Sequence, residues 1–138
     1  MTEKKASEIR ENILFIVLLV VLVALFLSLG RILHTDVPLA VVSSWSMEPT
    51  LHVGDLVIVQ GQSSYKPGDI VVYSTGHSLV VHRIVRILDD GSFLTKGDAN
   101  IYADAIHPKL SQIKGKVILV APYFGSLKLF IERLVNGR

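Results

Sequence analysis

An apolar run near the N-terminus constrains this chain more than any other feature. Residues 13–30 read ILFIVLLVVLVALFLSLG and carry no charge. As an α-helix this run would be about 27 Å long, close to the thickness of the hydrocarbon layer of a bilayer. A helix in a protein core keeps a polar stripe, and this run has none. We therefore expect a transmembrane anchor over residues 13–33, preceded by a short tail over residues 1–12.

A removable signal sequence is the alternative interpretation of the same run. Ser28 and Gly30 would suit the small-residue positions of a cleavage site after Gly30. The apolar core of a signal sequence is about 7–15 residues long, however, and this run is longer. Its length favours a retained anchor.

The charges beside the run predict its orientation. Lys4, Lys5 and Arg10 precede it, and Arg31 is the one basic residue that follows closely. Because basic residues are enriched on the cytoplasmic side, we expect a single-pass membrane protein with a cytoplasmic N-terminus. The rest of the chain would be extracytoplasmic, outside the cell membrane or, in a eukaryote, in the lumen of the endoplasmic reticulum (ER).

Residues 34–122 have the pattern of one mainly β domain. Short runs rich in β-branched residues alternate with turn pairs such as Pro67-Gly68 and Asp90-Gly91. The expected strands lie within residues 37–44, 55–60, 65–75, 78–88, 92–97 and 116–122. This spacing is typical of an antiparallel sheet or a partly open barrel.

The last segment, residues 123–138, shows helical periodicity instead. Its apolar residues are Tyr123, Phe124, Leu127, Phe130, Ile131, Leu134 and Val135, and Lys128, Glu132 and Arg133 fall off that stripe. The segment predicts an amphipathic helix, which either packs on the sheet or lies in a membrane surface.

Composition excludes several functions. The net charge is +2 and no basic run is present, so nucleic acid is not an expected partner. The chain has no cysteine, which excludes disulfides and a thiol nucleophile. His52, His77, His82 and His107 lack the spacing of compact metal sites. We expect neither a metal nor a cofactor.

Ser46 is the first candidate for chemistry. It lies between two strand-like runs, in VVSSWSMEPTLHVGDLVIV, and is followed by Met47-Glu48-Pro49. Pro49 disfavours a helical conformation at Glu48 and stiffens the loop. A serine needs a nearby base to become a nucleophile, so most loop serines are merely solvated. A stiff loop between core strands, however, can hold the hydroxyl of a serine in one orientation.

His82 and two aspartates complete the candidate set. In a strand, His82 shares a face with Val80 and Ile84, so it is either a buried histidine bonded to a backbone carbonyl or a general base. The ordinary pKa of histidine, about 6.5, suits a base near neutrality. Asp98 and Asp104 follow in LTKGDANIYAD, and either could hold the imidazole. Lys96 is the rival base, in a Ser-Lys dyad.

The motifs SSWSMEPTLHVGDLVIV, GDIVVY, VVHRIVRI and LTKGDANIYAD follow one another after a single anchor. Together they resemble type I signal peptidases, in particular the ER and archaeal branch, which uses histidine where bacterial members use lysine. The resemblance covers the chain from the anchor to about residue 122. It implies a coiled β-sheet domain with shallow pockets on a single N-terminal transmembrane helix.

The resemblance also implies residue roles. Ser46 would be the nucleophile, His82 the base and Asp104 the acid of the triad, with Asp98 in a supporting role. Ser44 and the backbone N–H of Ser46 would bind the oxyanion. This chain departs from the family at Trp45, where glycine is usual. Glycine allows φ > 0 and a close approach of the substrate backbone, which tryptophan does not; Trp45 would have to point into the core or the membrane interface.

The implied function is a membrane-bound serine endopeptidase that removes signal peptides after small residues, as in Ala-x-Ala. Its partners would be preprotein signal peptides, the lipid membrane and other subunits of a signal peptidase complex. The alternative is a non-catalytic, membrane-anchored β-module that binds partners or assists an assembly. It would have little reason to keep Ser46, His82, Asp98 and Asp104 together.

Overall fold

The computed structural model describes the backbone of residues 2–136 and, within that range, the side chains other than those of residues 2–6, 128, 129, 132, 133 and 136. The first element, α1 (Thr2–Ile32), contains almost all of the predicted anchor. It also includes most of the predicted tail, where Lys, Glu, Ala and Arg favour a helix and neither Gly nor Pro interrupts it. Within α1, Ser7–Ile32 is long and apolar enough to cross a membrane and is not buried by the rest of the protein. The side chains of Lys4 and Lys5 lie outside the described ones.

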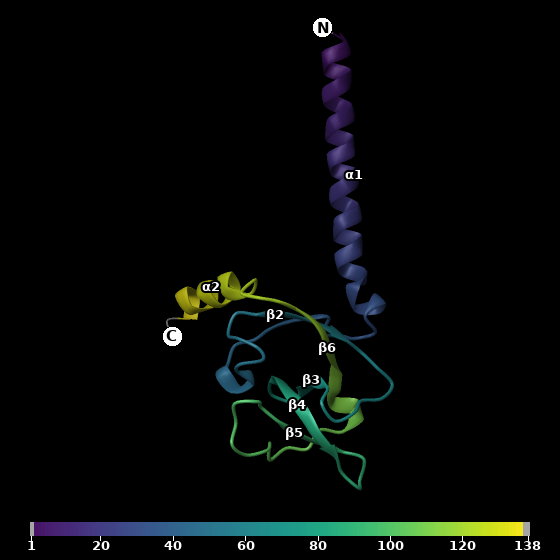
Figure 1. The fold of residues 1–138 in the computed structure, drawn as a ribbon. Helices are drawn as coiled ribbons and strands as arrows, with labels where there is room; N and C mark the ends of the chain where they lie inside the picture. The colour runs from purple at the N-terminus through teal and green to yellow at the C-terminus, as the bar shows by residue number, and fades with distance from the viewer. Residues whose placement is uncertain (1, 137–138) are drawn as a thin grey trace.

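Six strands form one antiparallel sheet in the order β1-β2-β6-β3-β4-β5 (Figure 1). Their bounds are β1 (Leu39–Val41), β2 (Leu56–Gln60), β3 (Ile70–Ser74), β4 (Leu79–Ile87), β5 (Phe93–Lys96) and β6 (Ile113–Ala121). The mainly β domain on an N-terminal helix is therefore confirmed. Each predicted strand contains an observed one, except that β6 begins earlier than predicted, at Ile113.

Strand β3 separates two hydrophobic clusters, because consecutive side chains of a strand point to opposite faces. Val72 belongs to the first cluster, with Val42, Met47, Leu51, Val57 and Val59. Val71 and Tyr73 belong to the second cluster, with Tyr65, Ile84, Phe93 and Ile113. The first cluster buries the segment around Ser46, and the second supports the strand that carries His82. The segments that carry Ser46 and His82 therefore pack on different clusters, and both clusters include side chains of β3.

The chain that leaves α1 is bonded to the β2–β6 part of the sheet. The N–H of Gly61 donates to the carbonyl of Leu33 at 2.8 Å, and Thr35 Oγ1 donates to the carbonyl of Lys114 at 2.6 Å. Lys114 Nζ also pairs with Asp36 at 2.7 Å, and its hydrogen bond holds the pKa of that carboxyl below its ordinary value. These bonds fix the point at which α1 joins the domain.

The C-terminal helix α2 (Ser126–Asn136) follows a turn after β6 and begins later than the predicted segment. Its described apolar side chains, Leu127, Phe130, Ile131, Leu134 and Val135, are all exposed. Packing of this stripe on the sheet, one of the two predicted alternatives, is therefore wrong. Hydrogen bonds from Tyr123 and Gly125, in the turn before α2, join this segment to the domain. The off-stripe residues Lys128, Glu132 and Arg133 lie outside the described side chains.

Candidate active site

Ser46 lies in a single turn of 3-10 helix, η1 (Trp45–Met47), between β1 and β2. Met47 and Leu51 on either side of Pro49 are fully buried in the first cluster, which fixes the loop to the core. Glu48 is extended, with φ −60° and ψ 145°, as expected for a residue before proline. Ser46 is thus partly exposed, on a loop that the buried side chains of Met47 and Leu51 attach to the core.

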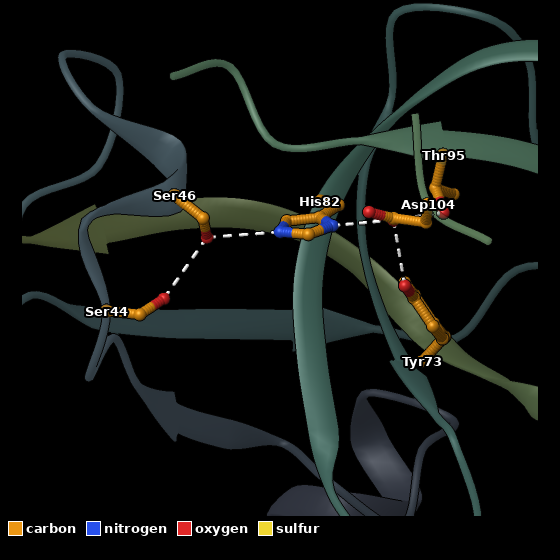
Figure 2. Close-up of polar contacts among 6 residues, drawn as sticks. All are labelled: Ser44, Ser46, Tyr73, His82, Thr95 and Asp104. Atoms are coloured by element: carbon orange, nitrogen blue, oxygen red, sulfur yellow. Dashed lines mark hydrogen bonds and ion pairs between the residues drawn. The ribbon is translucent and has the colours of Figure 1, made fainter. Parts of the chain in front are cut away.

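His82 lies in the middle of β4 and bridges Ser46 and Asp104 (Figure 2). Its Nε2 is 3.0 Å from Ser46 Oγ, and its Nδ1 is 2.6 Å from Asp104 Oδ2. The residue is only 8% exposed, so little water competes for either nitrogen. Of the two predicted environments, the structure shows the one with a serine and a carboxylate and not the one with a backbone carbonyl.

Asp104 is held by two further donors that the sequence analysis missed. Tyr73 Oη donates to Asp104 Oδ2 at 2.9 Å, and Thr95 Oγ1 donates to the same oxygen at 2.6 Å (Figure 2). Burial, followed by the effect of the Asp104 carboxylate, raises the pKa of Tyr73 to about 12, so its hydroxyl stays protonated. Tyr73 and Thr95 lie on β3 and β5, inside the motifs GDIVVY and LTKGDANIYAD, but neither motif by itself indicates a contact with Asp104.

These bonds indicate which histidine nitrogen carries the proton. A carboxylate accepts hydrogen bonds and cannot donate them, so Nδ1 of His82 must be the donor to Asp104. The neutral ring then has an unprotonated Nε2, directed at the Ser46 hydroxyl. This is the tautomer that a general base for Ser46 requires.

Asp98, the other candidate acid, is placed apart from His82. Arg83 binds it through Nε at 2.8 Å and through Nη2 at 2.6 Å, and Thr50 Oγ1 donates to it at 2.6 Å. The hydrogen bonds from Arg83 are the main reason that the pKa of Asp98 is lowered. Because Thr50 follows the Ser46 loop and Arg83 follows His82, Asp98 joins the two segments that carry them.

The segment after β5 also holds the backbone of the serine. The N–H of Ala99 donates to the carbonyl of Ser46 at 2.9 Å. A Cβ atom on Gly97 would lie 2.5 Å from that same carbonyl oxygen, so a larger residue would displace Ser46. The amine of Lys96, the rival base, donates to the Asn100 carbonyl at 3.1 Å.

Ser44 and Trp45 flank Ser46 differently. Ser44 Oγ lies 3.1 Å from Ser46 Oγ (Figure 2), so the two hydroxyls are adjacent. Trp45 is 71% exposed and therefore does not point into the core, one of its two predicted positions. It is not among the residues with positive φ. The backbone here makes no demand that only glycine could meet.

An open cleft of about 550 Å³ lies beside Ser46 and His82. Its lining comes from β1, the η1 segment and the beginning of β4, and includes Ala40, Val42, Met47 and Val81. The polar groups at the cleft are those of Ser43, Ser44, Ser46, His82 and Asn100. The lining of the cleft is therefore mixed, with apolar side chains beside these polar groups.

The remaining histidines do not add to this site. His52 lies 3.4 Å from Glu48 Oε2 and 3.7 Å from Asp55 Oδ2. Among the described residues there is no group of three or more His, Cys, Asp or Glu side chains that could hold a metal ion.

A serine hydroxyl, an imidazole and a carboxylate in hydrogen-bonded sequence define a serine hydrolase site, and an open cleft lies beside the serine. Sequence comparison agrees with this class. Residues 26–118 match the family described as Peptidase S24-like. The chain is 36% identical over 115 residues to the signal peptidase complex catalytic subunit SEC11 of Scheffersomyces stipitis, covering 78% of this chain and 67% of that protein.

Other relatives carry similar names. The SEC11 subunit of Chaetomium globosum is 35% identical over 121 residues, which is 75% of this chain and 69% of the relative. Human SEC11C is 38% identical over 87 residues, 56% of this chain and 45% of the relative. The chain therefore belongs to the Peptidase S24-like family, in which its relatives are signal peptidase catalytic subunits. The predicted resemblance to ER-type signal peptidases is confirmed.

Proposed function

We propose that this protein is a membrane-bound serine endopeptidase that removes N-terminal signal peptides from secreted and membrane preproteins. The observation that carries the proposal is the chain of contacts from Ser46 Oγ to His82 Nε2, at 3.0 Å, and from His82 Nδ1 to Asp104 Oδ2, at 2.6 Å. The names of its relatives supply the class of substrate.

In the proposed mechanism, Ser46 Oγ attacks the scissile carbonyl while its proton passes to His82 Nε2. Asp104 accepts a hydrogen bond from the Nδ1–H of His82 throughout and stabilises the imidazolium. Tyr73 and Thr95 keep the Asp104 carboxylate oriented toward His82. His82 then gives the proton to the leaving amine, and water hydrolyses the acyl-enzyme by the same route.

The oxyanion would be stabilised by the backbone N–H of Ser46 and the hydroxyl of Ser44. The distance of 3.1 Å between the two hydroxyl oxygens supports this role for Ser44. Arg83 and Asp98 would be positioning residues, since they contact the segments of Ser46 and His82 and not the reacting atoms.

The apolar side chains that β1 and β4 contribute to the cleft support the proposed preference for small, alanine-like residues at the first and third positions before the cut. Among the described strands, β1 pairs with β2 only, and an extended substrate would pair with its other edge.

We further propose a single-pass membrane protein with the N-terminus in the cytoplasm and the β domain on the other side. The apolar span in α1 and the basic residues before it support this orientation. Residues 1–12 would form the cytoplasmic tail, 13–33 the anchor, 34–122 the peptidase domain and 123–138 the amphipathic end. Because its relatives are named as subunits of a complex, further subunits are proposed partners.

Cleavage of a preprotein by the purified chain, in detergent with added lipid, tests the proposal. Wild type is compared with Ser46→Ala and His82→Ala, and the new N-terminus of the product is read by mass spectrometry. Cleavage after a small residue by wild type alone is expected. If neither wild type alone nor wild type in native membranes cleaves, the protein is a non-catalytic module and the proposal fails.

A further inference from the structure

The exposed stripe of α2 is an apolar feature of the domain that the proposed chemistry does not use. Leu127, Phe130, Ile131, Leu134 and Val135 are each at least half exposed, and Phe130 is 60% exposed. Tyr123 and Phe124, in the turn before α2, are exposed as well. With 11 residues, α2 is only about 16 Å long and cannot cross a bilayer.

The position of α2 relative to α1 indicates what covers this stripe. Figure 1 shows α2 at the end of the domain from which α1 leaves, at the level of the last turns of α1 and running across its direction. A helix that crosses a membrane-spanning helix at its exit lies roughly parallel to the bilayer surface. That is the orientation of an interfacial amphipathic helix.

Strands β2 and β6 connect the two helices. The exit of α1 is bonded at Gly61 and Lys114, close to the pair Gln60–Lys116. The turn before α2 begins at the opposite end of the same two strands, after the pair Leu56–Ala121. The two helices therefore bracket one pair of strands, and Ile118 and Leu119 of β6 between them are also exposed.

The root of α2 is fixed to the domain. The N–H of Gly125 donates to the carbonyl of Gly54 at 2.8 Å, and the N–H of Tyr123 donates to the buried carboxylate of Asp55 at 3.1 Å. Gly125 packs so closely on Val41 that a Cβ atom would overlap it. The turn from which α2 begins is thus fixed to the domain.

We propose that α2 lies in the headgroup region of the leaflet from which α1 emerges and is a second membrane contact of the catalytic domain. This inference rests on the proposed membrane location of the protein. One helix alone would let the domain rotate and tilt about its exit. Two contacts at opposite ends of the β2–β6 pair hold the domain in one orientation, so the cleft beside Ser46 stays at one height above the bilayer.

Fluorescence quenching tests this inference. Because the chain has no cysteine, a single cysteine can carry an environment-sensitive dye at a chosen residue. Phe130→Cys and Val135→Cys report on α2, and the second variant leaves the Phe130 ring in place. Ile87→Cys is the matched control, an exposed apolar residue at the end of β4, away from α1 in Figure 1. All variants carry Ser46→Ala, so the readout does not depend on peptidase activity.

The labelled full-length chains are reconstituted in phosphatidylcholine/phosphatidylglycerol vesicles. At residues 130 and 135 we expect iodide quenching to be at least about threefold weaker than at 87, and nitroxides attached near the headgroups to quench more than deep ones. Iodide quenching equal to that at 87 would mean that α2 is in water and would overturn the inference. Protection from both iodide and lipid nitroxides would overturn it too, because α2 would then be covered by protein.

Discussion

Arg83 binds both carboxylate oxygens of Asp98, through Nε at 2.8 Å and through Nη2 at 2.6 Å. Its neighbour on β4, His82, binds the other candidate acid, Asp104, at 2.6 Å. Because consecutive residues of a strand point to opposite faces, the two aspartates are sorted to two faces of β4. Asp104 is beside His82, the candidate base, and Asp98 is beside the guanidinium of Arg83.

The two aspartates should therefore differ in the effect of an amide substitution. We expect Asp104→Asn to lower kcat by about 10⁴-fold, because an amide at this position favours the wrong tautomer of His82. Asp98→Asn should keep most of the activity of the folded enzyme. Preprotein cleavage by both variants, with folding checked by thermal unfolding in detergent, makes the comparison. Equal losses in the two folded variants would contradict the assignment of Asp104.

His82 and Lys96 can be distinguished in the same assay. His82→Ala should lose about 10⁴-fold or more in kcat, since no other base contacts Ser46 among the described residues. Lys96→Ala should lose less than about tenfold, because Lys96 bonds the Asn100 carbonyl and not Ser46. An active His82→Ala enzyme beside an inactive Lys96→Ala enzyme would establish the dyad instead.

Ser44 is expected to act on the transition state. Ser44→Ala should lower kcat by about 10²–10³-fold with little change in KM, as for the loss of one oxyanion donor. Ser64→Ala, in an exposed loop, is the matched control and should behave as wild type. A rise in KM with unchanged kcat in Ser44→Ala would instead assign this serine to substrate binding.

Trp45 should be dispensable for the backbone geometry of the site. Its side chain is exposed and its φ angle is negative, so Trp45→Ala is expected to change the free energy of unfolding by less than about 0.5 kcal/mol. Thermal unfolding and preprotein cleavage measure the two effects. A large loss of activity with unchanged stability would show that the indole contacts substrate.

The Asp98–Arg83 pair should make stability depend on pH. The pKa of Asp98 is lower in the folded protein than in the unfolded chain, so the pair stabilises the fold above the ordinary carboxyl pKa of about 3.9. This contribution is lost as the pH falls through the lower, folded pKa. We expect Asp98→Asn to cost on the order of 1–3 kcal/mol at neutral pH.

The difference in unfolding free energy between wild type and Asp98→Asn should then narrow below about pH 4. Thermal unfolding of both proteins in detergent from pH 7 to pH 3 provides the measurement. A difference that stays constant over this range would mean that the charge of Asp98 does not contribute.

Local sequence was sufficient for the elements and, together with the family resemblance, it singled out Ser46 and His82 as candidates. The apolar run predicts α1, β-branched runs and turn pairs predict the strands, and the proline after Ser46 predicts an extended Glu48. These features depend on neighbouring residues, through side-chain periodicity and backbone sterics, and they can be read along the chain. The order of the strands in the sheet cannot be read in this way.

The composition of the site was decided by the tertiary structure. Ser46 and His82 are 36 positions apart, and Tyr73 and Asp104 are 31 positions apart. Only the pairing of β3, β4 and β5 brings Tyr73, His82 and Thr95 to one carboxylate and turns Arg83 toward the other. The exposure of the α2 stripe was likewise undetermined, because an amphipathic pattern is the same whether protein or lipid covers it. Contacts of this kind depend on strand register and on the neighbours that folding supplies.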